Sequence, residues 1–98
     1  MVTASERAVE KLREQLLHKV LEANIGFRIL ITNDEYGVAT FSIKIDRQRK
    51  GDEVIRAGGV KLFLDRPSAA RIGDYQLDYQ DGLNDGFFLN MPQEKQDD

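Results

Sequence analysis

The spacing of apolar residues changes from helical to alternating near residue 26 of this 98-residue chain. Before that point, apolar residues recur with the three- and four-residue spacing of an amphipathic helix. They are Val9, Leu12, Leu16 and Val20, widened by Ala8, Leu17 and Leu21. Thr3 and Glu6 have the spacing of a capping box, while Asn24 and Gly26 are residue types that end helices. The pattern therefore predicts a helix over residues 3–22 with one buried face.

After residue 26, apolar and polar positions alternate, which is the period of a half-buried β-strand. The alternation predicts three strand pairs: 27–32 with 38–45, 53–57 with 60–65, and 75–79 with 87–91. Gly58 and Gly59 join the second pair, and two adjacent glycines accept the positive φ angles of a tight hairpin. A short helix is expected over residues 67–72, because Pro67 suits a first helical turn and Gly73 suits the residue after the last.

The order of elements predicts a single α+β domain with a mainly β body. An amphipathic helix must bury its apolar stripe, and here only a sheet face is available to cover it. An apolar content of 41% in 98 residues fits one modest core and no second one. We place this domain at residues 1–92 and expect residues 93–98 to form a mobile acidic tail.

Composition excludes several classes of function. The chain carries 14 basic and 17 acidic residues, for a net charge of −3, which favours neither nucleic acid nor an anionic membrane as a partner. No apolar run has the length of a membrane span or the form of a secretion signal, so we expect a cytoplasmic protein. The absence of cysteine rules out disulfides, thiolate metal sites and thiol nucleophiles within this sequence.

Several blocks of sequence resemble the HesB-like domain, also known as the A-type iron–sulfur carrier domain. The matching positions are the opening helix from Thr3 to Leu17, the strand Phe27-Arg28-Ile29, the block from Gly59 to Asp65, then Ser68, Gly73, Asp78, Tyr79, the Gly82–Phe87 segment and Pro92. The resemblance implies a compact body, similar to a β-sandwich or barrel, of short and mostly antiparallel strands with an amino-terminal helix.

The departures from the family pattern fall on its three cluster-binding cysteines. The first cysteine corresponds to Glu35 if the alignment is anchored on Gly37, and to Tyr36 if it is anchored upstream. The other two belong to a motif that would begin near Asp98. Met91 also stands where the family usually has asparagine. The resemblance thus implies the scaffold without its ligands, and we expect no bound cofactor by this route.

The function implied by the resemblance is a non-catalytic one related to iron–sulfur cluster biosynthesis. Such a protein would act through contacts with assembly or client proteins. A stand-alone structural or protein-binding module, unrelated to that pathway, is the alternative. The oligomeric state stays open.

A carboxylate metal site is a further alternative. Glu35 and the tail residues Glu94, Asp97 and Asp98 could offer oxygen ligands to Fe³⁺, Mg²⁺ or Ca²⁺. The competing interpretation is an exposed turn and a solvated charged tail. His18 is the only histidine, so it cannot form a histidine metal cluster, and a catalytic triad would need Ser42 or Ser68 to reach it by folding. We expect His18 to make a helix-flank hydrogen bond or ion pair.

The remaining motifs favour structural roles over chemistry. The Asp81–Gly86 turn lacks the spacing of an EF-hand loop, and Gly58-Gly59 lacks the residues of a phosphate loop. Tyr75 and Tyr79 share a strand face and could stack a ligand, although core packing is the favoured interpretation. An active-site cleft would have to be built from Glu35, Asp78, Tyr79 or Asp81, and no spacing among these predicts a reaction. We therefore expect no enzyme.

Overall fold

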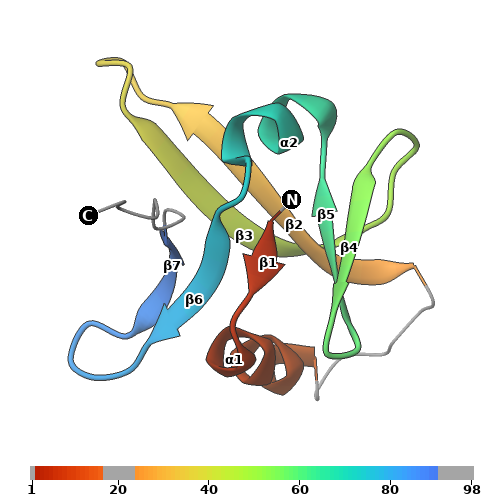
Figure 1. The fold of residues 1–98 in the computed structure, drawn as a ribbon, viewed down its shortest axis with the longest axis vertical. Coiled ribbons are helices and arrows are strands. Elements are labelled where there is room, and N and C mark those ends of the chain that lie inside the picture. Colours follow the sequence, from red (N-terminus) through yellow and green to blue (C-terminus); the bar gives the residue numbers. More distant parts are fainter. Residues whose placement is uncertain (1, 17–23, 91–98) are drawn as a thin grey trace, which may run out of the picture.

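The computed structural model describes residues 2–16 and 24–90, which form two β-sheets and two helices (Figure 1). In chain order the elements are β1 (Thr3–Ala4), α1 (Glu6–Leu16), β2 (Ile25–Asn33), β3 (Ala39–Arg47), β4 (Glu53–Ala57), β5 (Val60–Leu64), α2 (Arg66–Ile72), β6 (Gln76–Gln80) and β7 (Gly86–Asn90). One sheet has the strand order β1-β6-β7 and the other β3-β2-β5-β4. The predicted α+β, mainly β class is confirmed.

All three predicted strand pairs form antiparallel ladders, β2 with β3, β4 with β5, and β6 with β7. Gly58 and Gly59 have φ angles of 56° and 83°, so the β4–β5 turn uses the conformational freedom that the sequence provides there. The predicted short helix is α2, which is capped by Asp65 through a 2.8 Å bond from the Ser68 N–H and ends at Gly73.

The predicted capping box of Thr3 and Glu6 at the start of the helix is wrong. Thr3 and Ala4 form β1 instead, because the Thr3 N–H donates to the Tyr75 carbonyl at 3.0 Å and holds this segment extended beside β6. The cap is Ser5, whose Oγ accepts the Ala8 N–H at 3.1 Å, so the helix begins at Glu6. The predicted end of the helix near residue 22, together with His18, lies outside the described residues.

Two parallel ladders connect the hairpins, and the sequence pattern gave no sign of them. β1 pairs with β6, and β2 pairs with β5 through Phe27 opposite Leu62 and Arg28 opposite Phe63. The second contact requires close backbone approach: a Cβ on Gly26 would lie 2.5 Å from the Lys61 carbonyl oxygen. Each sheet is therefore mixed, although antiparallel pairing dominates as expected.

The core lies between the two sheets and under α1. Ala8, Val9 and Leu12 form the buried face of α1, as its apolar stripe predicted. They join one continuous cluster with Val2, Phe27, Ile29, Ile55, Val60, Leu62, Leu64, Ile72 and Leu77. Neither helix in the described part of the chain is long and apolar enough to cross a membrane.

Candidate functional site

The turn between β2 and β3 holds the positions that match the family's first cysteine. Asp34 organises this turn, because its Oδ1 accepts the N–H groups of Tyr36 at 2.8 Å and Val38 at 2.9 Å. Glu35 is exposed, and Tyr36 and Val38 are 84% and 57% exposed. Neither Glu35 nor Tyr36 is enclosed in a site, so this turn presents its side chains to solvent.

A pocket of about 640 Å³ opens beside the base of this turn. Its walls come from β2, β3, α2, β7 and the residue before β6; they are Ile31, Asn33, Thr40, Phe41, Arg71, Ile72, Tyr75, Phe88 and Leu89. Most of these side chains are apolar, and Arg71 is the one charged residue among them. The pocket thus lies between the base of the β2–β3 turn, which holds the positions matching the family's first cysteine, and strand β7.

No group of three or more His, Cys, Asp or Glu suited to a metal ion occurs among residues 2–16 and 24–90. Glu94, Asp97 and Asp98 lie outside those ranges, so their predicted partnership with Glu35 stays a prediction. The match of Asp98 to a family cysteine likewise stays a prediction.

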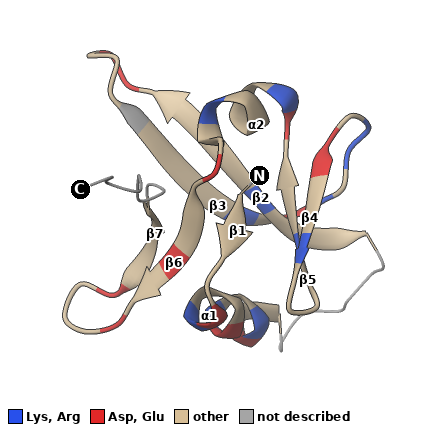
Figure 2. Ribbon diagram, in the orientation of Figure 1, with Lys and Arg blue, Asp and Glu red and all other residues tan. Residues whose placement is uncertain are grey.

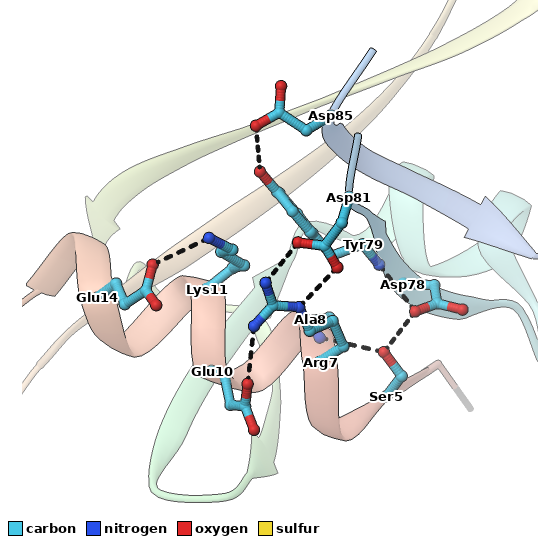
Figure 3. Close-up of polar contacts among 10 residues, drawn as sticks. All are labelled: Ser5, Arg7, Ala8, Glu10, Lys11, Glu14, Asp78, Tyr79, Asp81 and Asp85. Carbon is cyan, nitrogen blue, oxygen red and sulfur yellow. Dashed lines mark hydrogen bonds and ion pairs between the residues drawn. The ribbon is translucent and has the colours of Figure 1, made fainter. Parts of the chain in front are cut away.

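The candidate residues on β6 are engaged in a polar network with α1 (Figure 3). Asp78 accepts three hydrogen bonds: from Ser5 Oγ at 2.7 Å, from the Tyr79 N–H at 2.8 Å and from Asn90 Nδ2 at 3.0 Å. The Ser5 hydroxyl and then the Tyr79 N–H hold the pKa of Asp78 below its ordinary value. A carboxylate stabilised in its charged form by three fixed donors is a structural acceptor and a weak candidate for a general base.

The neighbouring pair Arg7 and Asp81 is an exposed, forked ion pair. Arg7 Nε donates to Asp81 at 2.8 Å and its Nη2 contacts the other carboxylate oxygen, while Nη1 bonds Glu10. The hydrogen bonds from Arg7 hold the pKa of Asp81 below its ordinary value. The carboxylates of Asp81 and then Glu10, by accepting these bonds, raise the pKa of Arg7. This pair ties α1 to the β6–β7 turn.

Tyr79 is packed and bonded, so its ring is not an open stacking surface. Its hydroxyl donates to Asp85 at 3.0 Å, its ring meets Phe87 edge-on at 5.0 Å, and Lys11 Nζ lies 5.1 Å from the ring centre. Desolvation and then the bond to Asp85 raise the pKa of Tyr79. Tyr75, by contrast, lines the pocket. The shared ligand-stacking face suggested for the two tyrosines is therefore not formed.

These β6 residues do not combine with Glu35 into a cleft. Figure 1 shows the β2–β3 turn and α1 at opposite ends of the molecule. Ser42 is exposed on β3, and the buried Ser68 uses its hydroxyl to accept the Ile31 N–H at 3.1 Å. Glu35 therefore lies apart from Asp78, Tyr79 and Asp81 in the fold.

A buried charge cluster on β2 was missed by sequence reasoning. Alternation placed Arg28 on the polar face of its strand, yet the residue is 2% exposed. Its guanidinium donates to Asp46 at 2.7 Å, to Asp52 at 2.6 and 2.9 Å, and to the Arg47 carbonyl at 3.1 Å. Within the described residues every buried side-chain nitrogen or oxygen has a partner. The cluster joins β2, β3 and the loop before β4 and leaves no free group for chemistry.

The fold defined by these elements is that of the A-type iron–sulfur carrier proteins. No protein-family model matches the chain. The structure of Escherichia coli SufA, described as involved in biosynthesis of iron–sulfur clusters, matches with a TM-score of 0.79 and 19% identity over 98% of this chain and 84% of SufA. The structure of IscA with a [2Fe-2S] cluster matches with a TM-score of 0.77 and 19% identity over 98% and 89% of the two chains.

Among curated sequences, the uncharacterized protein y4vC of Sinorhizobium fredii is 28% identical over 94 residues, which cover 94% of this chain and 88% of y4vC. The likeness to SufA and IscA extends over nearly the whole chain, and the chain has no cysteine. The fold expected from the sequence resemblance is thus confirmed.

Proposed function

We propose that this chain is a non-catalytic relative of the A-type carriers that contributes to iron–sulfur cluster biosynthesis through protein contacts and carries no cluster itself. One observation supports the proposal above all: the SufA and IscA fold spans the chain, while its 98 residues contain no cysteine. Iron–sulfur clusters in proteins are held mainly by cysteine thiolates, so the scaffold lacks the donors that a carrier needs. We place this role in the cytoplasm.

The β2–β3 turn is the contact surface that the geometry favours. Tyr36 and Val38 expose apolar side chains there, and the hydrogen bonds to Asp34 fix the backbone that presents them. Tyrosine is enriched at protein interfaces because its large ring gains contact area at low entropic cost. A hydrogen-bonded turn with two exposed apolar side chains is suited to docking on a partner protein.

Affinity capture from the native cell extract tests the proposal. The tagged wild-type chain should recover iron–sulfur assembly proteins, and the double variant Tyr36→Ser/Val38→Ser should lose them. Leu83→Ser is the matched control, because Leu83 is fully exposed in the β6–β7 turn and its removal also deletes one apolar surface side chain. Consistent absence of assembly proteins from the wild-type capture would contradict the proposal and favour a stand-alone module.

A further inference from the structure

The pocket between β2, α2 and β7 has the composition of a small-molecule site. Its volume of about 640 Å³ falls inside the range of roughly 300–1,000 Å³ that is usual for ligand pockets. Ile72 is buried and Ile31, Phe41, Tyr75 and Leu89 are partly buried in its walls. Such pockets typically combine an apolar lining with a few polar groups that orient the ligand.

Arg71 supplies the polar group. It is exposed in the last turn of α2 and lines the pocket beside the apolar walls, and it makes no hydrogen bond or ion pair with any described residue. This distinguishes it from Arg7 and Arg28, whose guanidinium groups are both occupied by carboxylates. A positive charge is favourable at the carboxyl end of a helix, where Arg71 lies. No described residue accepts a hydrogen bond from its side-chain N–H groups.

The described lining of the pocket carries positive charge and no negative charge. Among the lining residues that the structure describes, none is acidic, and the other polar ones, Asn33 and Thr40, are neutral. Thr40 Oγ1 is already hydrogen-bonded to Thr32 on the neighbouring strand at 3.1 Å. A ligand that fits both the apolar walls and the Arg71 guanidinium, which has no partner among the described residues, must carry an apolar part and a negative end, since Arg recognises carboxylates with paired N–H donors.

We propose that this pocket binds a small amphipathic anion, with an apolar chain or ring against Phe41, Phe88 and Leu89 and a carboxylate on Arg71. The site requires neither iron nor a protein partner, so it goes beyond the function proposed above. If the pocket binds no such anion, the outcome of the affinity capture is unaffected. If the affinity capture recovers no assembly protein, the binding of a ligand in the pocket is likewise unaffected.

An NMR titration of the ¹⁵N-labelled protein with decanoate, kept below the concentration at which it forms micelles, tests the site. Saturable shifts are expected for the backbone amides of Ile31, Phe41, Arg71 and Leu89. Decanol is the uncharged comparison, with the same chain and no carboxylate. Decanoate should bind about fivefold more tightly than decanol, which is the factor that one exposed charge pair supplies.

Two variants separate the charge from the pocket. Arg71→Gln should weaken decanoate binding about fivefold and leave decanol unchanged. Arg66→Gln is the matched control, because Arg66 is an exposed residue of the same helix that does not line the pocket, and it should change neither. Shifts that do not saturate, shifts that map to another surface, or equal decanoate affinities for wild type and Arg71→Gln would each overturn the proposal.

Discussion

Removing Asp52 should destabilise the fold strongly, because Asp52 is the main partner of a buried guanidinium. Arg28 donates to Asp52 at 2.6 and 2.9 Å, and both side chains are 3% exposed. Asp52→Ala would leave two donors of Arg28 without an acceptor in a place that water does not reach. Acidic and basic residues are interspersed along the ribbon (Figure 2), and the side chains of two other ion pairs, Arg7 with Asp81 and Lys11 with Glu14, are between 25% and 57% exposed.

The size of the effect follows from what remains after the substitution. Breaking a buried ion pair from one side costs about 3–5 kcal/mol. Arg28 keeps Asp46 and the Arg47 carbonyl, which places the loss near the lower end, at about 3 kcal/mol. In a domain of this size each 1 kcal/mol lowers the melting temperature by about 4–8 °C, so a loss of about 3 kcal/mol should lower it by roughly 12–24 °C. The loss is a large part of a total stability of roughly 5–15 kcal/mol.

Urea unfolding followed by circular dichroism measures the loss. Asp52→Asn removes the negative charge and keeps the hydrogen bond within the loop, because the amide oxygen can still accept the Arg49 N–H that Asp52 accepts at 2.7 Å. Glu14→Ala is the exposed comparison: Glu14 pairs with Lys11 at 3.3 Å on α1, and exposed pairs contribute about 0–1 kcal/mol. If Asp52→Ala lowers the free energy of unfolding no more than Glu14→Ala does, the buried cluster does not stabilise the fold as argued.

The same cluster should make the free energy of unfolding depend on pH in the acidic range. The hydrogen bonds from Arg28 hold the pKa values of Asp46 and Asp52 below the ordinary 3.8. The folded state therefore binds fewer protons than the unfolded state, so this stabilisation is present above about pH 5 and is lost as the pH falls through 3.8 toward the lowered values. The urea midpoint of wild type should decline over that interval more steeply than that of Asp52→Asn, and equal slopes would contradict the assignment.

The remaining predictions use the same unfolding assay. Gly26→Ala should cost about 2 kcal/mol or more, because its Cβ would lie 2.5 Å from the Lys61 carbonyl oxygen, whereas Gly86→Ala meets nothing within 4 Å and should be nearly neutral. Equal midpoints for the two variants would show that β2 and β5 do not approach so closely. Ser5→Ala should cost about 1–2 kcal/mol, since Ser5 both caps α1 and donates to Asp78, and an unchanged midpoint would argue against that cap.

Much of the fold could be predicted from the sequence, because its hairpins depend on local signals. Alternation located β2 and β3, and Gly58-Gly59 fixed the β4–β5 turn. The parallel ladders could not be predicted in this way, since they pair residues far apart in sequence and β1 is only two residues long. That pairing also explains the error at the amino terminus, where a tertiary contact outweighed the local capping signal of Thr3.

The candidate site was harder to predict from the sequence than the fold was. The cysteine-matched positions Glu35 and Tyr36 were located on their turn, but a pocket requires knowing which segments meet. Its walls combine Asn33, Arg71 and Phe88, which no local period connects. Arg28 was misplaced because a period of two gives the face of a strand and does not reveal that both faces are covered.

Anaerobic reconstitution with ferrous iron and sulfide tests the central claim most directly, with IscA treated in parallel as the positive control. After removal of unbound metal, iron and sulfide are counted per chain and the visible absorption spectrum is recorded. The account predicts no stoichiometric iron and no visible chromophore for this chain, because it has the carrier scaffold without cysteine. A stable, stoichiometric chromophore would contradict it.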